Sequence, residues 1–128
     1  MSKIGAVVCD DLMFTSRITG TARALNLEMR VCRRPADVQA LAAAQPLACV
    51  IIDLDQSGLD IAALVAAVKQ AGPATVVGFG SHVATETLRA ARAADCDLVL
   101  PRSQFVQVLA ADLPSWFDPA NPSPHPSP

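Results

Sequence analysis

Short runs of apolar residues alternate along the chain with segments in which apolar residues recur every three or four positions. Runs such as 4–9 and 49–53 are typical of strands that are buried on both faces of a parallel sheet. Each segment between two runs carries one apolar face, as amphipathic helices do. The pattern predicts strands at 4–9, 27–32, 49–53, 74–79 and 97–100 and helices at 15–26, 35–45, 60–70, 84–94 and 103–113.

Strict alternation of strands and helices indicates an α/β fold, with helices on both faces of a five-stranded parallel sheet, because right-handed crossovers place successive helices that way. We expect one domain over residues 1–113. Residues 114–128 contain six prolines. Such a segment cannot pack a core, so it is predicted to be a disordered or extended tail whose start Trp116 and Phe117 can tether.

Composition excludes several classes of function. The formal net charge is -2 and only 17% of residues are charged, so we expect no binding to nucleic acid or to an anionic membrane. The apolar run near the N-terminus is too short for a signal peptide, and no run is long enough to span a bilayer, so a cytoplasmic protein is expected. The cysteines are far apart and lie in or beside strand-like segments, which predicts buried free thiols at Cys9, Cys32, Cys49 and Cys96.

Carboxylates follow two of the predicted strands. Asp10 and Asp11 end the first strand and Asp53 ends the third, and ligands gather at the carboxyl ends of strands in open α/β sheets. If the three carboxylates converge, they repel one another by about 1 to 4 kcal/mol per close pair. A Mg²⁺ ion, which prefers oxygen ligands, would offset that repulsion. The alternative is that Asp53 only turns the chain after a strand.

This combination of residues resembles the receiver domain of bacterial two-component response regulators. The resemblance covers residues 3–113 and rests on the acidic pair after the first strand, on Asp53, and on the Leu59-Asp60 step into the third helix. It implies a flavodoxin-like doubly wound sheet with strand order 2-1-3-4-5. It also implies that Asp53 is the phosphoacceptor, that Asp10 and Asp11 hold Mg²⁺ with Asp53, and that the backbone carbonyl of Asp55 completes the metal site.

Two positions depart from the receiver pattern. Receivers usually end strand four with a Thr or Ser that binds the phosphoryl group, and here Gly80 or Ser81 stands there, followed by His82. His82 is interpreted as a loop residue at the edge of the site, with a contact to phosphate or to a partner as the alternative. Strand five usually ends in Lys-Pro, whereas this chain has Pro101-Arg102. The guanidinium of Arg102 can still pair with phosphate, so the resemblance is to an atypical or degenerate receiver.

The resemblance implies a stand-alone receiver that accepts a phosphoryl group from a histidine kinase or phosphotransfer protein. It would signal to a downstream protein by contact, and its helix four, strand five, helix five face is also a candidate homodimer surface. The alternative is an interaction module of the same fold that works without phosphorylation. Under neither interpretation do we expect an enzyme, apart from the slow loss of the protein's own phosphoryl group.

Two enzyme-like interpretations fit the sequence less well. Asp53-Leu54-Asp55 is similar to the nucleophile motif of haloacid-dehalogenase-type phosphatases, but that motif follows the first strand in those enzymes and the third strand here. Thr19-Gly20-Thr21 is faintly similar to the phosphate loop of flavodoxins, but it falls inside a predicted helix. The chain also has no Tyr with which to sandwich a flavin.

Overall fold

The structure is a computed structural model that describes residues 3–81, 83 and 85–118. Its strands form one parallel sheet in the order β2-β1-β3-β4-β5, which confirms the predicted order. The strands are β1 (Ile4–Val8), β2 (Met29–Cys32), β3 (Leu47–Asp53), β4 (Thr75–Gly80) and β5 (Leu98–Pro101). The helices are α1 (Leu12–Ala24), α2 (Pro35–Ala44), α3 (Ile61–Ala71), α4 (Thr85–Ala93) and α5 (Arg102–Phe117).

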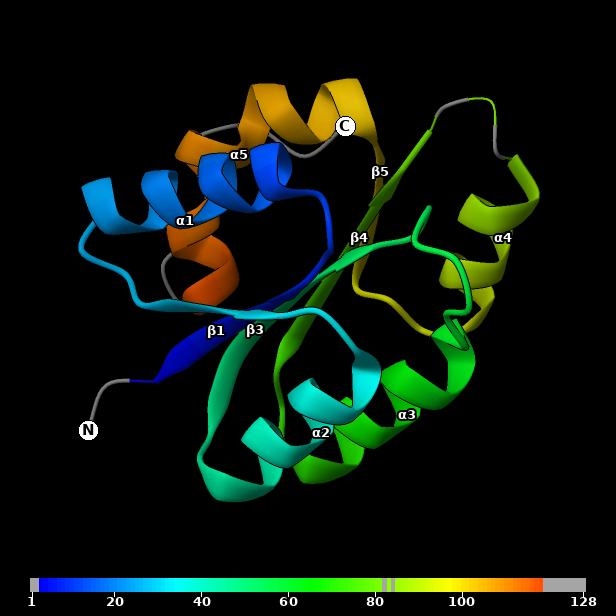
Figure 1. Ribbon diagram of the computed structural model, residues 1–128, viewed down its shortest axis with the longest axis horizontal. Helices are drawn as coiled ribbons and strands as arrows, with labels where there is room; N and C mark the ends of the chain where they lie inside the picture. The colour runs from blue at the N-terminus through cyan, green and yellow to red at the C-terminus, as the bar shows by residue number, and fades with distance from the viewer. Residues whose placement is uncertain (1–2, 82, 84, 119–128) are drawn as a thin grey trace.

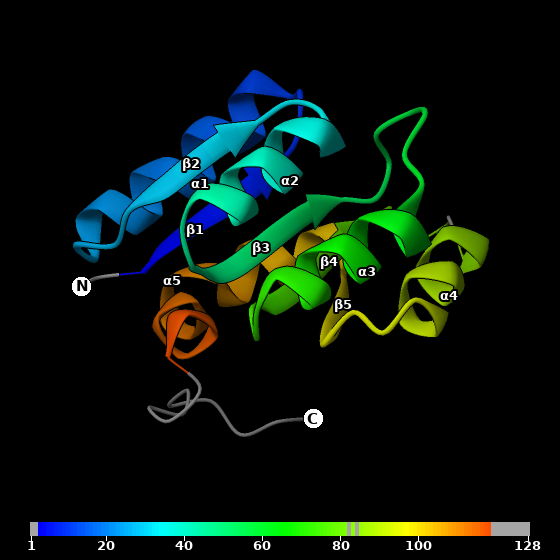
Figure 2. The ribbon, with the colours of Figure 1, turned by 90° about the horizontal axis from the view of Figure 1, so that it is seen from below.

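The sheet is the middle of three layers. Helices α1 and α5 lie on one face, and α2, α3 and α4 lie on the other (Figures 1 and 2). Along β3 the side chains of Cys49 and Ile51 join the core under α1 and α5, whereas Val50 and Ile52 join the opposite core. All seven residues of β3 are buried. This double burial is why the strand is a continuous apolar run rather than an alternating one.

Aromatic rings stack in a column on the α1–α5 face. The ring centroids of Phe14 and Phe79 are 4.7 Å apart, those of Phe79 and Phe105 are 4.5 Å apart, and those of Phe105 and Trp116 are 5.9 Å apart. The column joins α1, β4 and α5, and Phe79 and Phe105 are fully buried. These contacts fix the two helices above the carboxyl end of β4.

The last helix extends past the predicted domain boundary at residue 113. Helix α5 continues through Pro114 to Phe117, and Trp116 is 6% exposed within the aromatic core. Burial of the indole ring therefore anchors the first part of the predicted tail to the domain. Residues 119–128 of that tail lie outside the described residues.

All four cysteines are free thiols, as predicted: Cys9, Cys32 and Cys49 are buried and Cys96 is partly buried. Burial is the main cause that raises their pKa values, to about 12 for Cys9 and about 11 for Cys96. They are therefore protonated at neutral pH. In the described part of the chain, no helix is long and apolar enough to cross a membrane.

Removal of the central ring of the aromatic core is expected to destabilise the protein strongly. Phe105→Ala should lower the free energy of unfolding by about 3–5 kcal/mol, because it deletes a fully buried ring and leaves a cavity. Met13→Ala is the control: its side chain is 84% exposed and the change should be within about 0.5 kcal/mol. Urea unfolding monitored by circular dichroism measures both, and equal losses would contradict the assignment of the core.

Candidate functional site

Asp53 is the last residue of the central strand and is only 4% exposed. Strand β3 lies between β1 and β4, with Ile52 opposite Val8 and Asp53 opposite Phe79. The residues that follow β1 and β4 therefore flank the Asp53 carboxylate. This placement follows from the predicted strand order, in which β1 and β4 flank β3.

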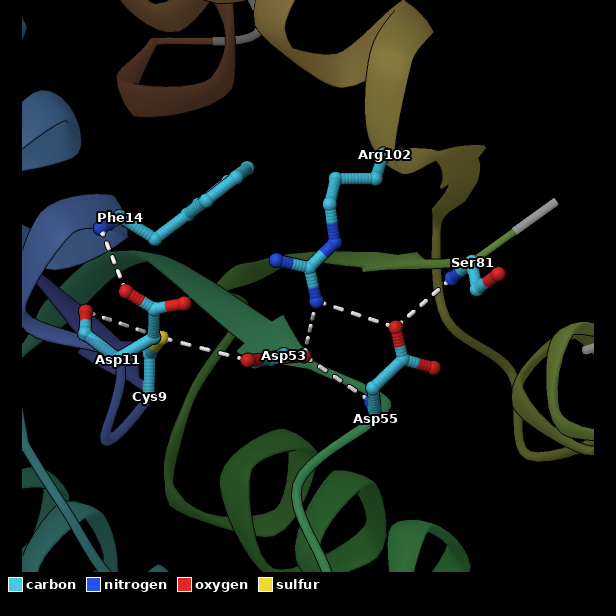
Figure 3. Close-up of polar contacts among 7 residues, drawn as sticks. All are labelled: Cys9, Asp11, Phe14, Asp53, Asp55, Ser81 and Arg102. Atoms are coloured by element: carbon cyan, nitrogen blue, oxygen red, sulfur yellow. Dashed lines mark hydrogen bonds and ion pairs between the residues drawn. The ribbon is translucent and has the colours of Figure 1, made fainter.

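Three donors surround the Asp53 carboxylate (Figure 3). The backbone N–H of Asp55 donates to Oδ1 at 3.0 Å, and Arg102 Nη2 lies 3.4 Å from the same oxygen. On the other side, the Cys9 thiol donates to Oδ2 at 3.4 Å. Both carboxylate oxygens thus have partners within the protein.

Arg102 reaches the carboxylates from the first position of α5. Its Nη2 is 3.1 Å from Asp55 Oδ2, so one guanidinium nitrogen bridges Asp53 and Asp55. The guanidinium carbon also lies 4.7 Å from the Phe14 ring centroid and 5.4 Å from that of Phe79. The end of the aromatic column therefore holds the cation against the two acids. The structure shows that Arg102 reaches the site despite its shifted place in the sequence, while its role toward a phosphoryl group stays a prediction.

Ser81 follows β4 and contacts the same cluster through its backbone. Its N–H donates to Asp55 Oδ2 at 2.8 Å, and its hydroxyl accepts a hydrogen bond from Val83 N at 3.4 Å. Gly80, the other candidate for the Thr or Ser position of receivers, is the last residue of β4. A Cβ added to it would lie 3.3 Å from Asp55 Oδ1. Ser81 therefore borders the site, and His82 lies outside the described residues.

The acidic pair Asp10-Asp11 lies between β1 and α1. Asp11 is the N-cap of α1: its Oδ1 accepts from Met13 N at 3.0 Å and from Phe14 N at 3.1 Å, and Figure 3 shows it turned toward that helix. Asp10 is exposed. The contact to Asp53 from the end of β1 comes from Cys9, whose thiol donates to Oδ2. The sequence predicted Cys9 only to be a buried thiol. The capping bonds use one carboxylate oxygen of Asp11, and the role of Asp10 and Asp11 as magnesium ligands stays a prediction.

The predicted magnesium ligands do not form a cluster as they stand. Within the part of the chain that the structure describes, no group of three or more His, Cys, Asp or Glu side chains could hold a metal ion. One oxygen of Asp11 caps α1, and Oδ1 of Asp53 faces the Asp55 N–H and Arg102 Nη2. As they lie, the described residues therefore do not fit a magnesium site.

Burial controls the protonation of Asp53. Loss of water raises the pKa of this carboxyl group above its ordinary value, and the nearby charge of Asp55 raises it further. The Asp55 N–H, the Cys9 thiol and the Arg102 guanidinium act in the opposite direction and only partly compensate. The site thus holds its central carboxylate at an energetic cost, which its donors reduce.

Comparison with known proteins gives no match to a protein-family model or to a curated protein. Solved structures do match. NtrX from Brucella abortus in complex with ADP superposes with a TM-score of 0.77 at 20% identity, over 94% of this chain and 28% of that chain. A response regulator from Thermotoga maritima gives a TM-score of 0.75 at 8% identity, over 91% of this chain and 98% of that chain.

A third match is a receiver domain in a complex. The Saccharomyces cerevisiae receiver domain of Ssk1, crystallised with the histidine phosphotransfer signalling protein Ypd1, gives a TM-score of 0.72 at 15% identity, over 90% of this chain and 89% of that chain. This chain has the fold of response-regulator receiver domains. The resemblance inferred from the sequence is therefore confirmed for the receiver fold, and the chain spans less than a third of the NtrX chain.

Two substitutions at Asp11 test its capping role. Asp11→Ala should lower the free energy of unfolding by about 0.5–2 kcal/mol, because two N–H groups of α1 lose their acceptor. Asp11→Asn keeps an acceptor oxygen and should unfold at nearly the wild-type urea concentration. An equal loss in both variants would show that the charge of Asp11 matters rather than the cap.

The raised pKa of Asp53 predicts a pH dependence of stability. The folded protein binds the proton of this carboxyl group more tightly than the unfolded chain does, so its contribution to stability is largest below the unfolded pKa and is lost as pH rises through the folded pKa. Asp53→Asn should therefore be more stable than wild type at neutral pH, and the difference should shrink as pH falls. Urea unfolding at a series of pH values measures it, and a less stable Asn variant at neutral pH would contradict the prediction.

Proposed function

We propose that this chain is a receiver-type signalling domain in which Asp53 accepts a phosphoryl group. The observation that carries the proposal is the ion pair at the carboxyl end of the central strand, where Arg102 Nη2 lies 3.4 Å from Asp53 Oδ1. A guanidinium in this position can pair first with the carboxylate and then with a phosphoryl group attached to that carboxylate, because guanidinium groups bind both kinds of anion.

The transfer itself is a displacement at phosphorus. A carboxylate oxygen of Asp53 attacks the phosphorus of a phosphohistidine, an O–P bond forms, and the N–P bond breaks as the imidazole nitrogen takes the electron pair and then a proton. Because Asp53 is 4% exposed, its covering side chains must turn aside before a donor can reach it. Arg102, whose side chain is 33% exposed, is the more accessible of its two side-chain partners.

Addition of a phosphoryl group would redistribute the contacts of Arg102. One guanidinium nitrogen now serves Asp53 and Asp55, and Asp55 also accepts from the Ser81 N–H. A group carrying about two negative charges competes for that cation, which loosens the bridge from α5 to the end of β4. The signal would then leave by protein contact through the α4, β5 and α5 face, which is also the proposed homodimer surface.

The proposed donor is a histidine kinase or phosphotransfer protein. The receiver domain of Ssk1 shares this fold and was crystallised with such a protein, which supports the same class of partner here. The downstream partner is proposed to be a protein, and no turnover of other substrates is proposed.

A second candidate function is binding to a partner without phosphorylation. It is favoured by the completeness of the present contacts, since both oxygens of Asp53 are satisfied and its carboxylate is nearly buried. In that case the Asp53–Arg102 pair would hold α5 against the sheet permanently.

Chemical phosphorylation separates the two candidates. Incubation of the full chain with acetyl phosphate, with and without Mg²⁺, should add the mass of one phosphoryl group, because Asp53 is the carboxylate that Arg102 accompanies. Asp53→Asn should abolish the adduct, whereas the exposed helix cap Asp60 can be changed to Asn as a matched control without effect. Intact-protein mass spectrometry measures both, and absence of an adduct on wild type would leave only the second candidate.

A further inference from the structure

Arg102 occupies the space between the carboxylates at the sheet edge, where a cation would bind. We propose that its guanidinium takes the place of a divalent metal ion, so that this receiver-like site needs no Mg²⁺ to hold its acidic residues together. The inference rests on the proposed function in one respect only, namely that the site is a receiver-type phosphorylation site. It is carried by the contacts of Arg102, Asp53 and Asp55.

One oxygen of Asp53 and one oxygen of Asp55 already accept from protein donors. Asp53 Oδ1 faces Arg102 Nη2 and the Asp55 N–H, and Asp55 Oδ2 faces Arg102 Nη2 and the Ser81 N–H. A metal ion that used these oxygens would have to displace the guanidinium. It would also lie close to a fixed positive charge, and like charges at contact distance repel strongly in a partly buried site.

The remaining Asp53 oxygen faces a poor ligand for a hard cation. Its neighbour is the Cys9 thiol, which is buried and lies 3.4 Å away. Mg²⁺ prefers oxygen ligands in near-octahedral geometry, and sulfur is a ligand for softer metals. The β1 side of the site therefore supplies a hydrogen-bond donor to Asp53 where a metal site would need another acceptor.

The guanidinium also packs on two aromatic rings. Its carbon lies over the Phe14 and Phe79 rings at 4.7 and 5.4 Å from their centroids. Stacking on aromatic faces suits the planar guanidinium, which is less strongly hydrated than an ammonium group. In Figure 3 the side chain descends from the start of α5 onto Asp53 and Asp55, on the side opposite Cys9. Arg102 thus contacts two carboxylates and two aromatic rings at once, and it is a fixed counter-ion for Asp53 and Asp55.

Removal of the guanidinium should therefore create a metal site. In Arg102→Gln, Asp53 and Asp55 lose their common positive charge, and a divalent cation becomes the available replacement. Calorimetric titration of the full chain with MgCl₂ should show no saturable binding to wild type in the millimolar range. The Gln variant should bind at least about tenfold more tightly, because one repulsive charge is gone.

Two further variants serve as controls. Arg89→Gln removes an exposed arginine that pairs only with Glu86 among the contacts of the described residues, and it should behave as wild type. Arg102→Gln combined with Asp53→Asn should lose the gained affinity. Saturable Mg²⁺ binding to wild type as tight as to Arg102→Gln, or no gain in that variant, would overturn the inference.

A second measurement covers the case in which Arg102→Gln is unstable. Trp116, the only Trp of the chain, lies at the far end of the aromatic column and reports unfolding by fluorescence. Mg²⁺ should raise the unfolding temperature of the Gln variant and leave that of wild type unchanged; a rise in wild type would itself overturn the inference. A phosphoryl adduct on Asp53 is measured separately, by mass spectrometry. The proposed function can therefore fail while this inference holds, and this inference can fail while the proposed function holds.

Discussion

A nearly buried carboxylate at the end of the central strand requires a counter-charge, and the ion pair between Asp53 and Arg102 meets that requirement. The strand that delivers Asp53 is buried on both faces, so the carboxylate arrives where water is scarce. An ionised acid in such a place is costly unless it is paired and hydrogen bonded. The Asp55 N–H after β3, the Cys9 thiol after β1 and Arg102 at the start of α5 supply those bonds.

This requirement links the site to the hydrophobic core. The rings that support the Arg102 guanidinium, Phe14 and Phe79, belong to the same column as Phe105 and Trp116. Movement of Arg102 away from Asp53 would therefore also disturb its packing on Phe14 and Phe79, at the junction of α1, β4 and α5. If Asp53 is phosphorylated as proposed, the change in charge would reach the core through this packing, without a long chain of polar contacts.

The alternation of apolar runs and amphipathic segments was sufficient to predict a parallel α/β sheet with Asp53 at the end of its third strand, whereas the strand order came from the resemblance to receiver domains. It was not sufficient to predict which residue after β1 faces Asp53. Successive side chains at a strand end point to opposite sides, so a shift of one residue exchanges Cys9 for an acid. The position of Asp11 before α1 is a capping signal that the sequence does contain. The reach of Arg102 depends on ring stacking between elements distant in sequence, which no local pattern encodes.

The same ion pair sets the choice between a switch and a constitutive module. Asp53, Asp55 and Arg102 together carry two negative charges and one positive charge, and the Ser81 N–H supports Asp55. A phosphoryl group on Asp53 would raise the negative charge while the number of donors stays the same. The excess must then be met by a rearrangement that draws Arg102 from Asp55, or by a cation that a partner supplies. In the unmodified site both oxygens of Asp53 already have protein donors, so any such switch has to break the contacts that Arg102 makes with Asp53 or Asp55.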